Sequence, residues 1–291
     1  MHFPVSGVDC SPLLPPLVAF AISTLTASAG VSGAFLLLPF QMSVLGFVTP
    51  AVSPTNLVYN IVAVPGGVYR YIREGRMTWP LAWAIVVGTL PGLFFGALIR
   101  IHYLPDPKPF KVFVGFVLLY LAVRLIRGLL AAKPRSAMPA GATVKTVSVS
   151  PTKIEYEFRG DLFAFRPAAI LALAAVVGLI GGIYGIGGGA IIAPFIVAVF
   201  GLPVYTVAGA ALFGTFASSV AGAGFFELLG LSSGRAVRPD WALGMLFGIG
   251  GLLGTYTGAR LQKHLPERWI RVFLSVLITG LAISYVAQYF L

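Results

Sequence analysis

The stretch GLIGGIYGIGGGAIIAPF, from Gly178 to Phe195, places a cluster of glycines inside a strongly apolar run. The whole run, Pro167 to Gly201, has 35 residues, whereas one helical crossing of a bilayer needs about 20. Each glycine weakens a helix by about 1 kcal/mol, so the cluster from Gly185 to Gly189 should end one helix and start another. The run therefore predicts two half-helices, which either cross the membrane twice or re-enter on one side.

A weaker copy of this stretch occurs in the first half of the chain. AGVSGAFLLLPF, from Ala29 to Phe40, matches YGIGGGAIIAPF, from Tyr184 to Phe195, at a spacing of 155 residues. The copy also lies in an apolar run of 35 residues, Leu13 to Phe47. Lys111-Val112-Phe113 returns as Arg271-Val272-Phe273 at a spacing of 160. Because the order of these elements is retained, the sequence indicates a duplication.

The composition excludes a water-soluble globule. Of the 291 residues, 58% are hydrophobic and 10% are charged, whereas soluble domains carry about 25% charged residues. Apolar runs suited to transmembrane helices follow one another along the chain: Leu13 to Gly30, Ala51 to Val68, Leu81 to Ile99, Phe110 to Arg127, Pro167 to Tyr184, Val204 to Phe226, Trp241 to Ala259 and Ile270 to Leu291. They lack the alternation of barrel strands, so the predicted fold is an all-α membrane protein.

The net charge of +11 arises in the connections and does not indicate nucleic-acid binding. Lysines and arginines lie almost wholly between the apolar runs, as topology determinants do. If the N-terminus is outside and each broken region returns to its starting side, 15 basic residues are cytoplasmic and 5 are external. Treating each region as one span gives at best 13 against 7. The charges favour two inverted repeats, each with a glycine-broken helix pair plus three transmembrane helices.

The chain divides into three parts. Residues 1–131 are expected to form the first transmembrane repeat, and residues 167–291 the second. Residues 132–166 are polar and basic, so we expect a cytoplasmic linker, with a short β-hairpin where Thr143 to Phe158 alternates. No charged residue falls in the middle of an apolar run, although Glu227 and Arg260 lie near run ends.

The glycine breaks are candidate anion sites. A helix N-terminus carries unpaired N–H groups and roughly +0.5 of a charge. In inverted halves, half-helices starting near Gly33 and Gly189 would approach the midplane from opposite sides and hold an anion without a buried lysine or arginine. The candidate residues at the breaks are Gly30, Ser32, Gly33, Gly185, Gly187, Gly188 and Gly189.

The alternative role for a glycine in a membrane helix is close packing. We favour packing for the series Gly88, Gly92 and Gly96, and for its copy Gly250, Gly254 and Gly258, because single glycines four residues apart line one helix face. The consecutive glycines of the breaks exceed what packing requires, so for them we favour the functional role.

Polar side chains near the breaks are further candidates. Asn56 and Asn60 lie four residues apart on one face of an apolar helix. Their repeat mates are Ala211 and Thr215, followed by Ser218 and Ser219. Amide and hydroxyl groups could donate to sulfonate or carboxylate oxygens, so Asn56, Asn60, Thr215, Gln41 and Tyr184 are candidate substrate contacts. The alternative is hydrogen bonding between helices, worth about 0.6 kcal/mol on average in membranes.

The sequence shows no constellation for catalysis or metal binding. Cys10 is the only cysteine, and His102 and His264 occupy matching places at the ends of apolar runs. Gly185-x-Gly187-x-x-Ala190 imitates a dinucleotide-binding fingerprint but has no strand before it. The sequence therefore predicts neither an enzyme nor a cofactor.

The glycine-rich stretch, its weaker copy and the linker ending IEYEFRGDLFAFRP resemble the TauE/SafE family of sulfite exporters and anion permeases. The resemblance covers nearly the whole chain, although the first copy has Ser32 and Ala34 where the second has Gly187 and Gly189. It implies a secondary transporter of sulfite, thiosulfate or organosulfonates such as sulfoacetate across the bacterial cytoplasmic membrane. Its partners would be the small anionic substrate and the lipid bilayer. An anion channel and a membrane scaffold that transports nothing are the alternatives.

Overall fold

The computed structural model describes residues 1–28, 32–130, 143–233, 237–261 and 267–290, and it is mainly helical. The first half has a hairpin, β1 (His2–Phe3) and β2 (Val8–Asp9), then α1 (Leu14–Ser28), α2 (Ala34–Ser43), α3 (Val52–Ala63), α4 (Pro65–Arg73), α5 (Trp79–His102) and α6 (Pro107–Leu130). Strands β3 (Val144–Val149), β4 (Ile154–Phe158) and β5 (Asp161–Phe165) follow. The second half has α7 (Pro167–Tyr184), α8 (Gly189–Phe200), α9 (Val204–Ser233), α10 (Trp241–Leu261) and α11 (Glu267–Phe290).

Both long apolar regions are broken into two helices at the glycine-containing motifs. α7 ends at Tyr184 and α8 begins at Gly189, while α1 ends at Ser28 and α2 begins at Ala34. The breaks predicted from the glycines are confirmed. α2 and α8 have 10 and 12 residues, so each is about 15–18 Å long and too short to cross a hydrocarbon core of about 30 Å.

The expectation of one continuous helix over Ala51 to Val68 is wrong. α3 ends at Ala63 and α4 starts at Pro65. Proline lacks an N–H and restricts the residue before it, so it starts a new helix here. The corresponding position in the second half, at the spacing of 155, is Val220, and α9 continues through it for 30 residues.

The two halves pack reciprocally through glycine faces. α5 of the first half lies against α7 of the second, where a Cβ on Gly92 would be 1.9 Å from the Ala175 carbonyl oxygen. α10 of the second half lies against α1 of the first, where a Cβ on Gly250 would be 2.0 Å from the Pro16 carbonyl oxygen. A Cβ would also clash with the facing helix at Gly88, Gly96, Gly254 and Gly258. The packing role predicted for both series is confirmed.

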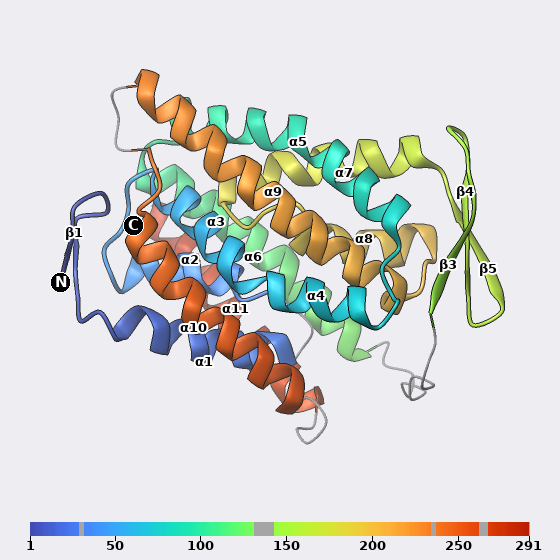
Figure 1. The fold of residues 1–291 in the computed structure, drawn as a ribbon. Helices are drawn as coiled ribbons and strands as arrows, with labels where there is room; N and C mark the ends of the chain where they lie inside the picture. Colours follow the sequence, from blue (N-terminus) through green and yellow to red (C-terminus); the bar gives the residue numbers. More distant parts are fainter. Residues whose placement is uncertain (29–31, 131–142, 234–236, 262–266, 291) are drawn as a thin grey trace.

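The broken pairs lie at opposite ends of the helical body. Figure 1 places both chain termini at one end and strands β3–β5 at the other. The α7–α8 pair begins just after β5 and returns to that end, because Thr206 Oγ1 at the start of α9 is 2.8 Å from the Tyr156 hydroxyl of β4. The α1–α2 pair begins after the N-terminal hairpin, and Ser43 Oγ at its end is 2.7 Å from the Tyr285 hydroxyl near the C-terminus. Each pair therefore starts and finishes at one end.

The linker carries a three-stranded antiparallel sheet in the order β3-β4-β5. The sequence indicated a hairpin here, and the structure adds the third strand, β5. β4 and β5 are joined by Arg159 and Gly160 alone, which both have positive φ (62° and 83°), as type I′ turns require. The sheet is fixed to the helices, since Tyr156 is buried and the Val144 N–H donates to the Gly75 carbonyl at 2.9 Å.

Within the described part of the chain, three helical segments are long and apolar enough to cross a membrane: Trp79–His102, Pro167–Tyr184 and Tyr205–Leu231. Shorter apolar helical segments are Leu14–Ala27, Ala34–Ser43 and Leu274–Tyr289. Large apolar side chains, such as Phe95, Leu228 and Val276, are exposed on the helices. Soluble proteins rarely expose extended apolar surface, so these faces suit contact with lipid.

Candidate functional site

The break between α7 and α8 is shaped by glycine conformations. Gly185 ends α7 in the left-handed region, with φ 88° and ψ 29°, and its N–H donates to the Gly181 carbonyl at 2.8 Å. Gly187 also has a positive φ, 72°. Gly188 precedes α8 as its N-cap, and its N–H donates to Ser218 Oγ at 3.0 Å. The chain thus reverses within four residues, which side chains at Gly185 or Gly187 would strain.

The neighbouring main chain also leaves no space for a side chain at this break. A Cβ on Gly185 would lie 2.2 Å from the Ser53 carbonyl oxygen, and one on Gly189 would lie 1.8 Å from that of Ala211. The Thr215 hydroxyl oxygen, Oγ1, is 2.3 Å from the position that a Cβ on Gly189 would take. The same hydroxyl donates a hydrogen bond to the Ala211 carbonyl. The main chains of α3 and α9 therefore pack directly against the break from two sides.

The first break differs in its neighbours. Gly30 lies outside the described residues, and Ser32 Oγ accepts the Ala34 N–H at 3.3 Å. Gly33 is the N-cap of α2 with an ordinary φ of −70°. A Cβ there would meet hydroxyl groups only, the nearest being the Tyr59 Oη at 2.7 Å. The nearest neighbours of Gly33 are therefore side-chain hydroxyls.

A hydrogen-bond network joins the two breaks. The Tyr184 hydroxyl donates to the Phe35 carbonyl in the first turn of α2, at 2.7 Å. Asn56 Nδ2 donates to the Ala34 carbonyl at 3.0 Å and to the Gly185 carbonyl at 2.9 Å. Asn60 Nδ2 donates to the Ile186 carbonyl at 3.0 Å. The structure thus brings the two breaks predicted from the sequence together, with α3 between them.

The two asparagines bind the carbonyl ends of the breaks. Both hydrogens of Asn56 Nδ2 are committed to main-chain carbonyls, and Gln41 Nε2 donates to Asn56 Oδ1 at 3.4 Å. The C-terminal end of α7 carries roughly −0.5 of a charge, which these donors offset, as does the hydroxyl of Ser53 on the Ile183 carbonyl. At the other side of the break, the Gly188 N–H at the N-terminus of α8 donates to Ser218 Oγ.

All of these side chains are enclosed. Gln41, Asn56, Asn60 and Tyr184 are 0% exposed, and Thr215 is 1% exposed. The crossing of the two breaks is therefore closed to solvent in this conformation. A ligand could reach it only after the surrounding helices move.

The sequence also matches a known protein family. The sequence profile described as "Sulfite exporter TauE/SafE" matches residues 16–285. The chain belongs to the TauE/SafE family.

Curated relatives of this TauE/SafE member carry transporter names. "Probable membrane transporter protein y4hK" of Sinorhizobium fredii is 26% identical over 262 residues, which cover 89% of this chain and 92% of the relative. "Probable membrane transporter protein YunE" of Bacillus subtilis is 22% identical over 262 residues, covering 88% and 90%. A "Probable membrane transporter protein" of Xylella fastidiosa is 27% identical over 264 residues, covering 87% and 86%. No solved structure matches the chain.

Family and fold together place this TauE/SafE protein in the cell membrane as a multi-pass transporter of a small substrate. TauE/SafE is a transporter family. The described residues hold no group of three or more His, Cys, Asp or Glu side chains that could bind a metal ion.

Arg100 lies one residue beyond the apolar run Leu81 to Ile99 but is buried. Its side chain, near the end of α5, is 0% exposed, and its guanidinium lies 3.7 Å from the centre of the Phe110 ring. It donates to Ser53 Oγ at 3.3 Å, to the Thr49 carbonyl at 3.4 Å and to the Leu104 carbonyl. No carboxylate of the described residues forms an ion pair with it.

Arg100 is linked to the end of α7, at the α7–α8 break, by hydrogen bonds through the Ser53 side chain. Ser53 Oγ accepts from Arg100 Nε and donates to the Ile183 carbonyl at 3.0 Å. Ile99 and Ile101 flank Arg100, which was the sequence signal that the apolar helix continues past it. A buried charge without a carboxylate partner is costly, and the hydrogen bonds of Arg100 to Ser53 and to the Thr49 and Leu104 carbonyls offset part of that cost.

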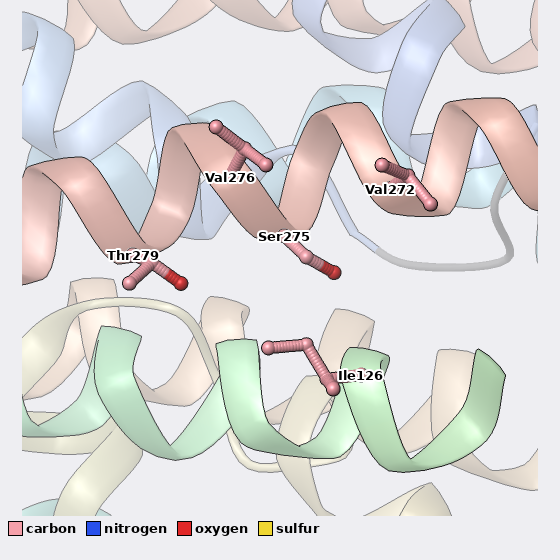
Figure 2. Close-up of a pocket in the computed structure, with 5 residues that line it drawn as sticks. All are labelled: Ile126, Val272, Ser275, Val276 and Thr279. Atoms are coloured by element: carbon pink, nitrogen blue, oxygen red, sulfur yellow. The ribbon is translucent and has the colours of Figure 1, made fainter. Parts of the chain in front are cut away.

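An apolar groove lies elsewhere, between α6 and α11. Its lining residues are Ile126, Val272, Ser275, Val276 and Thr279. Figure 2 shows Ser275 and Thr279 of α11 pointing toward α6, across from Ile126. None of the candidate site residues of this TauE/SafE protein lines the groove, so it is separate from the crossing of the breaks.

Proposed function

We propose that the protein is a secondary transporter of small sulfur oxyanions, such as sulfite, thiosulfate or sulfoacetate, across the bacterial cytoplasmic membrane. The observation that supports the proposal is the buried meeting of the two breaks, where Tyr184 and Asn56 join the first turn of α2 to the end of α7, four residues before α8 begins. Together the N-termini of α2 and α8 offer about one positive charge to an anion. The geometry alone suggests only a small anion. The choice of sulfur oxyanions rests on the name of the TauE/SafE family.

The main-chain amides of the breaks are the proposed anion donors. They belong to Gly30, Ser32 and Gly33 in the first break and to Gly185, Gly187, Gly188 and Gly189 in the second. Tyr184, Asn56 and Asn60 hold the two breaks together in the closed state, and Thr215 and Gln41 border them. Direct contact of Asn56 with the anion requires that its bonds to the carbonyls open.

The proposed transport mechanism is alternating access between two inverted repeats. Each broken pair starts and ends on its own side of the body, and the linker is on the side assigned to the cytoplasm by the basic residues (Figure 1). The reciprocal contacts of α5 with α7 and of α10 with α1 would let one set of helices rock against the other. The closed crossing corresponds to an occluded state of such a cycle.

Uptake by purified protein in liposomes tests the proposal. We expect saturable uptake of radiolabelled sulfite, thiosulfate or sulfoacetate. Gly187→Val should abolish it while leaving membrane insertion intact, because Gly187 has positive φ and a Cβ there would be 2.9 Å from Ser219 Oγ. Gly224→Val on α9 is the matched control, since a Cβ on Gly224 meets nothing within 4 Å.

The outcomes separate the candidate functions. Non-saturating flux with channel currents would replace the carrier by an anion channel, and wild-type protein that moves none of these anions would favour a scaffold. Uptake that survives Gly187→Val unchanged would reduce the glycine break to a packing feature.

A further inference from the structure

Asp240 joins the two halves of the body at the start of α10. Its Oδ1 accepts the Leu243 N–H at 3.1 Å, as the side chain before a helix often does. Its own N–H donates to Thr55 Oγ1, in the first turn of α3, at 2.9 Å. Asp240 is 2% exposed. Because α10 belongs to the second half and α3 to the first, Asp240 forms a tie between the halves.

The other end of the body has a corresponding tie. Thr78 precedes α5 as Asp240 precedes α10, at the spacing of 162 residues that also relates the glycine series of these two helices. Thr78 Oγ1 donates to the Thr206 carbonyl, in the first turn of α9, at 2.9 Å. The Tyr156 hydroxyl of β4 is 2.8 Å from Thr206 Oγ1, so a strand of the linker sheet is bonded to this tie.

The N-terminal hairpin is bonded to the tie at Asp240. Ser6, in the turn between β1 and β2, donates to Asp240 Oδ2 with its N–H at 3.1 Å and with its hydroxyl at 2.8 Å. Phe3 and Val8, one from each strand, are 0% and 3% exposed and belong to the hydrophobic core. The two β elements therefore cover corresponding ties at opposite ends of the body (Figure 1).

The tie at Asp240 lies next to the crossing of the breaks. Thr55 accepts the Asp240 N–H, and the next residue, Asn56, donates to the Ala34 and Gly185 carbonyls. The crossing is closed to solvent in this conformation. A path that opens between α3 and α10 at this end must break the bond between Thr55 and Asp240, because that bond joins the two helices.

We infer that the hairpin His2–Asp9 is a latch over the end of the body at which Figure 1 places the chain termini. The hydrogen bonds of Ser6 hold Asp240 against α3 in this closed conformation, and the hairpin moves away from the body when that end opens. This inference rests on the proposed function, because opening of that end is one half of the alternating-access cycle. In the proposed topology, the latch faces away from the cytoplasm.

The rate of Cys10 modification tests the latch without transport. Cys10 is the only cysteine of the chain, follows β2 directly and is partly buried against the core. In the purified full-length protein, Ser6→Ala should speed the reaction of Cys10 with a maleimide about three- to tenfold, because the hairpin loses one of its two bonds to a carboxylate. Asp240→Asn should also speed it, because Asn can still cap α10 through Oδ1 but turns an NH2 group toward Ser6.

Ser11→Ala is the matched control for this measurement. It removes an exposed hydroxyl next to Cys10 that accepts only the Leu13 N–H, at 3.4 Å, and has no bond to Asp240. The rate of Cys10 modification in Ser11→Ala should equal that of the wild type.

Tethering the hairpin to the body tests its role in transport. In a Cys10→Ala protein, the pair Ser6→Cys and Asp240→Cys, bridged by a short bismaleimide, should lose the anion uptake that the unbridged pair retains. The pair His2→Cys and Asp9→Cys is the matched control, because these residues are cross-strand partners within the hairpin. Its bridge leaves the hairpin free to move from the body, so uptake should continue.

Two results would overturn the latch. One is a Cys10 modification rate that is the same in Ser6→Ala, Asp240→Asn and the wild type. The other is uptake that continues unchanged once Ser6→Cys and Asp240→Cys are bridged. The proposed function fails separately: wild-type protein that takes up none of the sulfur oxyanions removes the substrate class, whereas faster Cys10 modification in the variants would still assign Ser6 and Asp240 to holding the hairpin closed.

Discussion

The two breaks have the same place in their repeats but are held in different ways. At the second break, Gly185 and Gly189 face the main chain of Ser53 and Ala211. At the first, Gly33 faces the hydroxyls of Tyr59, Ser23 and Thr26. The Ser23 and Tyr59 hydroxyls bond each other at 2.8 Å, whereas Ser219 at the second break has no partner among the described residues. Among the described residues, the Ser23 and Tyr59 hydroxyls beside Gly33 are therefore paired, whereas the Ser219 hydroxyl at the second break is not.

This difference predicts unequal responses to the same substitution. Gly185→Ala should destabilise the protein by about 2–5 kcal/mol, because the alanine must adopt positive φ and its Cβ would meet a carbonyl that cannot turn away. Gly33→Ala should cost about 1 kcal/mol, because φ is ordinary and the Tyr59 hydroxyl can shift. Thermal unfolding in detergent measures both. Equal losses would mean that the two breaks are held alike.

The second break also has Arg100 behind it. Arg100→Gln should raise the KM for sulfite uptake about three- to tenfold. The substitution removes the positive charge nearest the second break, to which Arg100 is linked by hydrogen bonds through Ser53. Arg100→Lys should restore part of the affinity. Lys111→Gln serves as the control, since it removes a basic residue that contacts Tyr285 and Gln288 instead. If Arg100→Gln lowers the Tm but leaves KM unchanged, Arg100 only caps α5 and the α2–α3 connection.

The smallest effect is expected where the breaks touch. Tyr184→Phe removes one hydrogen bond, from the Tyr184 hydroxyl to the Phe35 carbonyl, and leaves the ring in place. We expect a loss of about 0.5–1.5 kcal/mol in stability and uptake within a few-fold of wild type. Complete loss of uptake would instead give Tyr184 a direct role with the substrate.

The glycine breaks, and the glycine-lined contacts of α5 with α7 and of α10 with α1, could be predicted because their causes are local. Consecutive glycines disfavour a helix wherever they occur, and glycines four residues apart line one face of any helix. Pro65 lies within the apolar run Ala51 to Val68, and the end of α3 was missed because the run was assigned from hydropathy alone. Hydropathy does not show that a proline lacks a backbone N–H.

The partners inside the crossing could not be predicted. Which carbonyl Asn56 meets depends on how α3 sits against α7, and nothing in either helix alone sets that register. Arg100 looked like the end of a span, because its burial comes from Phe110 and Ser53 on other elements. The third strand was missed because Arg159–Gly160 is not among the commonest two-residue turns.

The linker sheet has a mechanical consequence. Through Val144 it is bonded to Gly75, which belongs to the first half, and through Tyr156 it is bonded to Thr206, which belongs to the second. A movement that separates the halves at that end must stretch or break at least one of these two bonds. In the proposed alternating-access cycle, strands β3–β5 would therefore act as a brace that limits how far the two halves separate there.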